Sequence, residues 1–199
     1  MIAKQIPLNK IPKDWKVVRL GDAIKFIKGK KPNEMTEEHG DYLPYLSTEY
    51  LRENKPTKFV KNLKDTILVN DGDLILLWDG SNAGEFFLGK RGVLSSTMVK
   101  IQLKRKDYDR RFLFYLLKMK ENYLKEQTKG TGIPHVDEAV LSNLIIPLPP
   151  LSEQQKIVEI LSTVDKKLEL ERKRKEKLER IKKGLMNDLL TGKKRVKIK

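Results

Sequence analysis

Four acidic residues, Asp71, Asp73, Asp79 and Glu85, lie within a segment of 15 residues and are the first candidates for chemistry. Clustered carboxylates can hold a divalent metal ion for phosphodiester hydrolysis. Here Gly72 separates the first two in an Asn-Asp-Gly-Asp sequence that is typical of a turn, and no nearby lysine completes a nuclease pattern. We therefore interpret the four carboxylates as turn residues and expect no bound metal.

Other catalytic signatures are also missing from the sequence. The segment Leu148-Pro149-Pro150-Leu151 lacks the polar first residue and the aromatic last residue of the amino-methyltransferase tetrad, and the chain has no GxGxxG or P-loop motif. It contains no cysteine, and its two histidines, His39 and His135, are far apart in sequence. Disulfides and thiolate metal sites are thereby excluded, and we expect no catalytic residue and no cofactor.

The formal net charge of +15 at pH 7 is the strongest compositional signal. Residues 152–199 hold 16 of the 42 Lys and Arg and 8 of the 27 Asp and Glu, so the excess is shared along the chain. Basic proteins of this size most often bind nucleic acid, while membrane surfaces, acidic proteins and a merely solvated lysine-rich surface are the alternatives. No apolar stretch approaches a membrane span or a secretory signal, so we expect a cytoplasmic protein without a membrane partner.

Residues 1–150 have the short apolar runs and turn residues of an α+β domain. Strands are predicted around residues 15–20, 66–69, 74–78, 84–89, 92–101 and 141–147, and a strand or an extended loop at 42–48. A short helix is predicted from Asp22 through Phe26 and a longer helix at 109–127. The glycine-rich segment 129–135 is predicted to be a flexible loop.

Residues 151–192 are predicted to form one long helix that follows two prolines and ends at Gly192. Ser152 and Gln155 have the spacing of a capping box at its start. Apolar residues recur along one side at steps of three and four. We call these residues the apolar seam: Ile157, Leu161, Val164, Leu168, Leu178, Ile181, Leu185 and Leu189.

An apolar seam of this length needs a second helix to cover it, and this sequence has one such helix, so we expect an intermolecular coiled coil. Glu171 and Lys175 lie on the seam where apolar residues would be expected. A partner with opposite charges at the matching positions would fix the register at some cost in stability. The alternative is a solvated helix that packs only at its ends and is supported by ion pairs such as Glu169 with Lys173.

Several motifs follow one another in a distinctive order. They are Trp15…Leu20-Gly21-Asp22 with Lys28-Gly29, Asp71-Gly72-Asp73-Leu74-Ile75-Leu76 with Trp78-Asp79-Gly80-Ser81, Gly130-Thr131-Gly132-Ile133-Pro134-His135, Leu148-Pro149-Pro150-Leu151-Ser152-Glu153-Gln154, and Leu190-Thr191-Gly192-Lys193. Their order and spacing resemble those of the specificity (S) subunits of type I restriction-modification systems over nearly the whole chain. The resemblance implies a mixed α/β target recognition domain at residues 1–150, a long coiled-coil helix at 151–192 that spaces and docks partners, and a basic tail at 193–199.

Typical S subunits carry two recognition domains and two conserved helices that pack antiparallel, whereas this chain resembles a half-length form with one of each. The resemblance therefore implies a homodimer through the helix that reads a bipartite, inverted-repeat target in double-stranded DNA. It also implies docking of modification (methyltransferase) subunits, and of a restriction subunit through them, which would carry S-adenosylmethionine, ATP and Mg²⁺. The exposed flank of the helix and the segment Lys193 to Lys197 are the candidate docking contacts, with a frayed tail as the alternative for the latter.

Contacts to DNA are expected from basic and polar residues on turns, because phosphate contacts supply affinity and side chains on loops read base edges. Lys28, Lys30 and Lys31 suit phosphates. The remaining candidates are Trp78, Asp79, Ser81, Asn82, Lys90, Arg91, Lys129, Thr131 and His135. Loop structure or solvation is the alternative role for each of them, and Trp78 also suits the core.

Two other functions remain open at this point. One is the specificity subunit of a type IIB-like system, in which a single partner chain carries both modification and cleavage; copurifying partners would distinguish it. The other is a coiled-coil scaffold that binds nucleic acid and is unrelated to restriction. Competition between duplex DNA and RNA would test that alternative.

Overall fold

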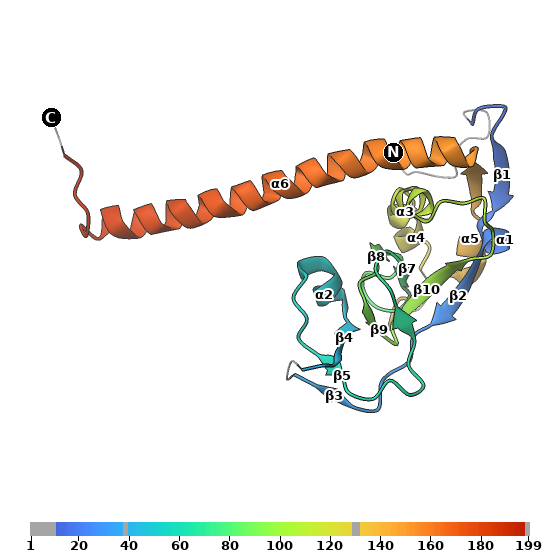
Figure 1. Cartoon of the computed structure of the whole chain (residues 1–199), viewed down its shortest axis with the longest axis horizontal. Coiled ribbons are helices and arrows are strands. Elements are labelled where there is room, and N and C mark those ends of the chain that lie inside the picture. The colour runs from blue at the N-terminus through green and yellow to red at the C-terminus, as the bar shows by residue number, and fades with distance from the viewer. Residues whose placement is uncertain (1–10, 38–39, 129–131, 198–199) are drawn as a thin grey trace. The chain divides into compact units, whose positions relative to one another are not determined.

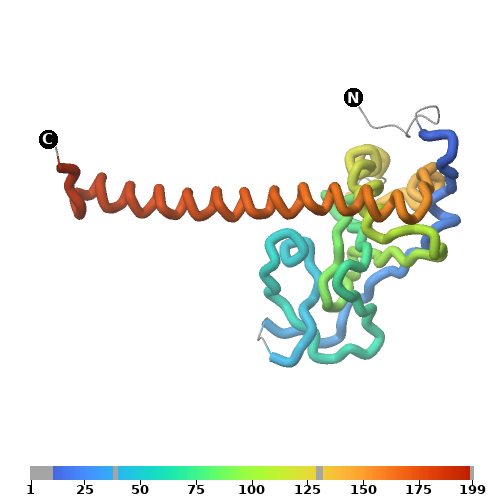
Figure 2. The backbone as a smooth tube through the Cα atoms, turned by 45° about the horizontal axis from the view of Figure 1, so that its top comes forward, coloured from blue at the N-terminus to red at the C-terminus, as the bar shows by residue number. Residues whose placement is uncertain are grey.

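The computed structural model describes residues 11–37, 40–128 and 132–197 (Figure 1). Two compact units meet between residues 155 and 156. The first holds the strands and short helices, and the second consists of most of one long helix (Figure 2). The fold class expected from the sequence, sheets with short helices followed by a long C-terminal helix, is confirmed.

The elements follow one another in a mixed order along the first unit. They are β1 (Lys16–Arg19), α1 (Leu20–Ala23), β2 (Ile24–Lys28), β3 (Met35–Thr36), β4 (Leu43–Leu46), α2 (Thr48–Glu53), β5 (Phe59–Val60), β6 (Leu68–Val69), β7 (Leu74–Leu77), β8 (Phe86–Leu88), β9 (Gly92–Leu94), β10 (Met98–Leu103), α3 (Arg110–Lys118), α4 (Glu121–Glu126), α5 (Glu138–Ser142) and β11 (Ile145–Leu148). Helix α6 (Leu151–Leu190) follows.

Three sheets organise this unit. The central sheet has the order β2-β10-β7-β8, and all its pairs are antiparallel. A second sheet has the order β3-β5-β4-β9-β6, with β4 and β9 parallel. Strands β1 and β11 pair antiparallel and bring the two ends of the unit together. The central strand β10 therefore holds β2 on one side and β7 on the other, which decides where the residues that follow those strands lie.

A hydrophobic core joins the first two sheets. Strand β7 is buried along its whole length, as the continuous apolar run Leu74-Ile75-Leu76-Leu77 predicts for a strand covered on both faces. The core cluster consists of Leu46, Val69, Ile75, Leu77, Phe87, Leu94 and Met98. These residues come from six elements of the two sheets, so the position of the β7 end depends on long-range packing.

The helix predicted from Asp22 through Phe26 is wrong for most of its length. Helix α1 ends at Ala23, and Ile24 to Lys28 form strand β2. Phe26 lies opposite Ile101 in the register with β10. Pairing with a strand more than 70 residues later overrides the local helix signal.

Two other predicted elements also differ from the structure. The helix predicted at 109–127 is interrupted between α3 and α4, where the N–H of Lys120 donates to the carbonyl of Leu117 in a tighter turn. The strand predicted at 141–147 begins later, at Ile145. Its first part belongs to α5, which Asp137 caps by accepting hydrogen bonds from the N–H groups of Ala139 and Val140.

Helix α6 is one uninterrupted helix of 40 residues, about 60 Å long at 1.5 Å per residue. The capping box is wrong, because the carbonyl of Pro150 accepts the first backbone hydrogen bonds, from Glu153 and Gln154, and Ser152 lies inside the helix. The helix ends at Leu190, and Gly192 follows with a φ of +73°, as the glycine stop predicts. Among the described residues, no helix is long and apolar enough to cross a membrane.

Candidate nucleic-acid interface

The ends of β2 and β7 bring Lys28 and Asp79 together although they are 51 residues apart. In the registers with β10, Lys28 lies opposite Val99 and Leu77 lies opposite Met98, so both strands end at the same place. The Nζ atom of Lys28 lies 2.5 Å from Oδ2 of Asp79, and the two side chains are 46% and 33% exposed. An ion pair this open to solvent contributes less than about 1 kcal/mol to stability, so both groups can exchange partners at little cost.

Trp78 contacts the sheet close to this ion pair. Its ring packs edge-on against Phe26 with the centroids 5.5 Å apart, and Nζ of Lys28 lies 5.8 Å from the Trp78 ring centroid. The side chain is half-buried. Trp78 therefore packs against the sheet and lies close to the exposed Lys28 ammonium.

His135 joins the same place from a third segment. It pairs with Asp79 in an isolated antiparallel bridge. The N–H of Val136 donates to the Trp78 carbonyl at 2.9 Å, and the N–H of Gly80 donates to the Pro134 carbonyl at 2.9 Å. Gly80 has a φ of +115°, a conformation that favours glycine, so the turn after Asp79 depends on that residue type.

We call Lys28, Trp78, Asp79 and His135 the Lys28–Asp79 group. Beside it lies an open hollow of about 420 Å³ lined by Asp79, Gly80, Ser96, Thr97, Ile133 and His135. Ile133 is 72% exposed. Sequence reasoning did not identify Ser96, Thr97 or Ile133 as site residues; the Ser95-Ser96-Thr97 run between two apolar segments was the available signal for the first two.

Ser81 and Asn82 continue from this group on the turn after Gly80. Both are exposed, and the Asn82 side-chain amide donates to Oγ of Ser81 at 3.4 Å. The turn is closed by the N–H of Ala83, which donates to the Gly80 carbonyl at 2.9 Å. The structure thus places Ser81 and Asn82 next to Asp79 with their side chains open to solvent.

Lys30 and Lys31 follow the end of β2. Gly29 fixes this end, because its N–H donates to the Met98 carbonyl at 2.9 Å and a Cβ there would lie 2.0 Å from the Ser95 carbonyl oxygen. Both lysines are exposed, and neither forms an ion pair within the described part of the chain. Their ammonium groups are accordingly available for external anions.

Lys90 and Arg91 lie on the turn between β8 and β9 and serve a different local structure. Nζ of Lys90 donates to Oδ1 of Asn54 at 2.5 Å and lies 5.0 Å from the Tyr50 ring centroid. Burial lowers the pKa of the Lys90 ammonium from its ordinary value. The backbone N–H of Arg91 donates to Asp71, and its side chain is exposed. No contact in the described ranges joins these two residues to the Lys28–Asp79 group. Lys129, Thr131 and His39 lie outside the described residues.

The four carboxylates of the 71–85 segment do not converge. Asp79 pairs with Lys28, Glu85 pairs with Arg52, and Asp71 accepts the N–H of Arg91. Within residues 11–37, 40–128 and 132–197, no group of three or more acidic or histidine residues is placed to hold a metal ion. Each of these three carboxylates thus contacts a different partner.

Asp73 has a purely structural environment. It is 5% exposed, and its carboxylate contacts Nζ of Lys100 at 2.6 Å, Nη1 of Arg110 at 2.9 Å and the N–H of Asn70 at 2.9 Å. Burial acts to raise the pKa of Asp73, but the hydrogen bonds from Lys100 and Asn70 and the charges of Lys100 and Arg110 together hold it below its ordinary value. The carboxylate thus ties β7 to β10 and to the start of α3.

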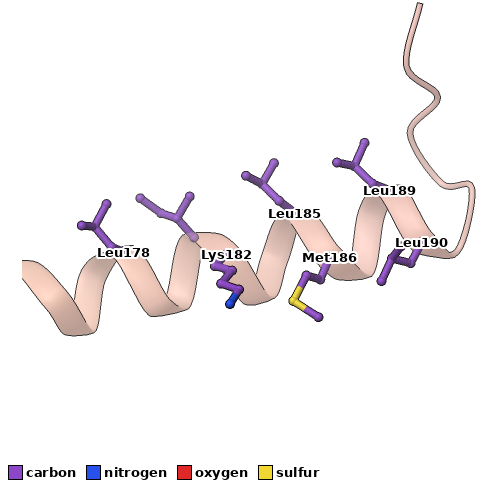
Figure 3. Close-up of a pocket in the computed structure, with 7 residues that line it drawn as sticks. Leu178, Lys182, Leu185, Met186, Leu189 and Leu190 are labelled. Carbon is purple, nitrogen blue, oxygen red and sulfur yellow. The ribbon is translucent and has the colours of Figure 1, made fainter.

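Along α6, the seam side chains from residue 161 onward are exposed, between 37% for Leu161 and 57% for Leu178, and Ile157 is partly buried. Near the C-terminal end of the helix they border an open apolar hollow of about 330 Å³. Figure 3 shows Leu178, Leu185 and Leu189 on one side of the helix, and Lys182, Met186 and Leu190 on another. The labelled side chains on both sides are exposed.

Comparison with known proteins gives a family match over residues 12–180, to the type I restriction modification DNA specificity domain. The MjaVIII type I restriction enzyme specificity subunit of Methanocaldococcus jannaschii is 57% identical over 183 residues, which cover 92% of this chain and 43% of that protein. The EcoDI specificity subunit of Escherichia coli is 28% identical over 185 residues, which cover 92% of this chain and 38% of that protein. The chain therefore spans less than half the length of these relatives.

Solved structures share the fold. The HsdS subunit of Thermoanaerobacter tengcongensis matches with a TM-score of 0.63 at 21% identity, over 92% of this chain and 46% of that one. The type I S subunit of M. genitalium matches with a TM-score of 0.64 at 19% identity, over 94% of this chain and 48% of that one.

Proposed function

Because this chain belongs to the type I restriction modification DNA specificity domain family, we propose that it is a non-catalytic subunit that selects the DNA sequence on which a type I restriction-modification enzyme acts. The observation that carries the proposal is the match over residues 12–180, which includes the whole Lys28–Asp79 group and most of α6. The relatives at 57% and 28% identity are named as specificity subunits.

The Lys28–Asp79 group is the proposed centre of base recognition. A carboxylate accepts hydrogen bonds from the exocyclic amino group of cytosine, and serine, asparagine and lysine side chains suit other base edges. Asp79, Ser81 and Asn82 provide such groups on one exposed turn. Lys28 neutralises Asp79 in the absence of DNA, so binding can exchange this ion pair for contacts to a base and a phosphate.

Lys30 and Lys31 are the proposed phosphate contacts. Both ammonium groups are exposed and form no ion pair with any residue that the structure describes, so they lose little when they bind phosphate and release counterions from the DNA. Lys90 is less suited to this role, since it is already held by Asn54 and Tyr50. Lys129 and Thr131 stay as candidates on sequence grounds alone.

The apolar seam of α6 is the proposed dimer interface. Its exposed leucines need a covering helix, and a second copy of the chain supplies one of the same length. Two identical recognition domains related by a twofold axis would read two inverted half-sites at a fixed spacing in duplex DNA. We accordingly propose a recognition domain at residues 1–150, a dimerisation helix at residues 151–192 and a basic tail at residues 193–199.

The second side of α6 is proposed to dock a modification subunit. Met186 and Leu190 are 48% and 79% exposed beside Lys182, so they present apolar surface outside the seam. The tail adds charge, although Lys193 and Lys194 already contact Asp188 at 3.8 and 2.8 Å. Methyl transfer and ATP-driven cleavage, with S-adenosylmethionine, ATP and Mg²⁺, would belong to the partner subunits.

The proposal is tested with the purified chain and its modification subunit. Binding to a labelled random duplex pool is competed with unlabelled duplex DNA and with RNA, and the chain alone is incubated with DNA and S-adenosylmethionine or Mg²⁺. We expect competition by duplex DNA and not by RNA, with no methylation or cleavage by the chain alone. Stronger competition by RNA, or methylation or cleavage of DNA by the chain alone, would contradict the proposal.

A further inference from the structure

We infer that Tyr45, which lies outside the Lys28–Asp79 group, is a positioning residue for base recognition. Its hydroxyl holds the turn Ser95-Ser96-Thr97, and this turn holds the backbone of Trp78 and Asp79. The inference rests on the proposed function, in which Asp79 contacts a base, and adds a residue on which the position of that carboxylate depends.

One carbonyl group accepts the backbone N–H groups of both Trp78 and Asp79. The pairing of β7 with β10 ends one residue before Trp78, so these two residues lie beyond the ladder. Their N–H groups donate to the Thr97 carbonyl at 2.9 and 3.1 Å, respectively. The opposite edge of the same segment pairs with residues 134–136. The Thr97 carbonyl therefore sets the position of Asp79 on the side that faces β10.

The Ser95 side chain sets the position of Thr97. Ser95 is 4% exposed, and its Oγ accepts the N–H of Thr97 at 3.3 Å and lies 2.9 Å from Oγ1 of Thr97. The Ser95 carbonyl accepts the N–H of Met98 at 3.0 Å, which closes the turn between β9 and β10. Thr97 itself is exposed and borders the hollow beside Asp79. Because burial does not fix Thr97, its contacts with Ser95 do so.

Tyr45 reaches this turn from the second sheet. It lies in β4 opposite Val93 of the parallel strand β9. The Tyr45 hydroxyl donates to Oγ of Ser95 at 3.0 Å and accepts the N–H of Ser96 at 3.3 Å. One hydroxyl thus contacts a side chain and a backbone group of the turn. A continuous series of hydrogen bonds therefore leads from Tyr45 through the turn to the backbone of Asp79.

The hydroxyl of Tyr45 can be removed without its ring. Tyr45→Phe keeps the apolar packing of β4 and deletes only the contacts to Ser95 and Ser96. A base contact needs its carboxylate close to ideal geometry, since hydrogen bonds weaken steeply as distance and angle change. Without the hydroxyl, DNA binding has to restore the position of the turn, at a cost no larger than the hydrogen bonds that were lost. We therefore expect a weaker base contact in a chain that still folds and binds DNA.

The proposed phosphate contacts have an attachment of their own. Lys30 and Lys31 follow Gly29, whose N–H donates to the Met98 carbonyl of β10 at 2.9 Å. Loss of the Tyr45 hydroxyl should accordingly leave the affinity for unrelated sequences unchanged, because phosphate contacts supply that affinity. A general loss of folded protein would instead weaken binding to every duplex. Sequence preference therefore separates a positioning role from a contribution to stability.

The test measures the affinity of the chain with its modification subunit for three duplexes. They are the selected target, the target changed at the base pair where Asp79→Ala relaxes the preference, and an unrelated sequence. For Tyr45→Phe, we expect the affinity for the target to fall about three- to tenfold and the other two affinities to stay the same. Tyr42→Phe, at a position just before β4 that is 38% exposed, is the matched control and should bind all three duplexes as wild type does.

A double substitution tests whether Tyr45 acts through Asp79. The Asp79→Ala chain lacks the base contact, so adding Tyr45→Phe to it should cause no further loss of preference. A structural role alone would give the same loss in both backgrounds. Ser95→Ala removes the oxygen to which the Tyr45 hydroxyl donates and should relax the same base position. It keeps the inference testable where Tyr45→Phe folds poorly.

The outcomes separate this inference from the function it rests on. Full base preference in Tyr45→Phe and Ser95→Ala, beside a relaxed preference in Asp79→Ala, would overturn the inference and leave the proposed function standing. Equal weakening on all three duplexes, or additive losses in the double variant, would also overturn it. Unchanged preference in Asp79→Ala would overturn the base contact of Asp79 and the inference together, while selection of a target by wild type would still support the recognition role. A wild-type chain that selects no sequence would overturn both.

Discussion

The side-chain oxygen of Gln154 accepts a hydrogen bond from the backbone N–H of Asp109 at 2.7 Å. Gln154 is fully buried, and its Nε2 donates to the carbonyls of Asp107 at 2.8 Å and Pro149 at 2.9 Å. Asp109 in turn caps α3 with its carboxylate, which accepts the N–H groups of Arg111 and Phe112. One amide therefore joins the first turn of α6 to the start of α3 inside the first compact unit.

This relationship predicts a large effect of Gln154→Leu. The substitution keeps the volume but leaves the N–H of Asp109 and two carbonyls unpaired, and each buried unpaired group costs about 1–3 kcal/mol. We expect the free energy of unfolding to fall by about 3 kcal/mol in urea titrations. The matched control is Gln155→Leu, at an exposed neighbouring position, which should change it by less than about 0.5 kcal/mol. Equal effects of the two substitutions would refute the anchoring role.

The Asp73 carboxylate predicts a second stability effect. Asp73→Asn removes the negative charge between Lys100 and Arg110 and leaves both cations without their buried partner. Breaking one partner of such a buried pair costs about 3–5 kcal/mol, and we expect a loss of about 3 kcal/mol at pH 7 in urea titrations. Asp41→Asn, at an exposed position, is the control and should be nearly neutral.

The same carboxylate predicts a pH dependence. Because the pKa of Asp73 is lower in the folded chain than in the unfolded one, the unfolded state takes up a proton first as the pH falls. The stabilisation by Asp73 is therefore complete above the unfolded pKa of about 3.9 and is lost as the pH falls through the folded value. Unfolding measured between pH 7 and pH 2.5 should show the difference between wild type and Asp73→Asn shrinking below pH 4. A constant difference across this range would contradict the ion pairs.

Lys30 and Lys31 should act on affinity and not on sequence preference. Changing both to Gln should weaken binding to all duplex sequences to the same degree. It should also reduce the slope of log K against log salt by about 1.8, at about 0.9 per phosphate contact. Lys106→Gln is a control elsewhere on the exposed surface of the same unit. An altered base preference in Lys30→Gln/Lys31→Gln would show that these lysines read bases instead.

Asp79 should act on sequence preference. Its ion pair with Lys28 is exposed, so Asp79→Asn should fold with a stability change below about 1 kcal/mol. Affinity for the selected target should fall by about 1–3 kcal/mol, with relaxed preference at one base position of each half-site. Asp65→Asn is the matched control, at an exposed position with a φ of 59° that asparagine tolerates. An unchanged base preference in Asp79→Asn would show that Asp79 does not contact a base.

The helix and the family were predictable because their signals lie in the sequence itself and do not depend on knowing which segments pair in the fold. The repeated steps of three and four and the terminal Gly192 identify α6 from its own residues, and the motif order led to the family that the match over 12–180 confirms. The pairing of the strands was harder to predict. Residues 66–69 and 74–78 are two apolar runs around a turn, but β6 pairs with β9 whereas β7 pairs with β10 and β8. No local pattern encodes such partners.

The same reason limited the prediction of the site. Lys28 and Asp79 were both candidates, but their ion pair exists because β2 and β7 flank β10, and that arrangement depends on long-range packing. Lys90, like Lys30, is a lysine in a turn. Its ammonium group contacts Tyr50 in α2 and Asn54 at the end of that helix, and these contacts are not apparent from the residues around Lys90 in the sequence. Ile133 carried no polar signal that would select it.

The most direct test of the account is selection from a random duplex DNA pool by the chain with its modification subunit, in parallel for wild type and Leu178→Glu. The account predicts two inverted half-sites at one fixed spacing for wild type. For Leu178→Glu, which places a charge in the exposed seam, it predicts a single half-site with the same bases. An asymmetric bipartite sequence from a homodimer, or no enriched sequence with the partner bound, would contradict it.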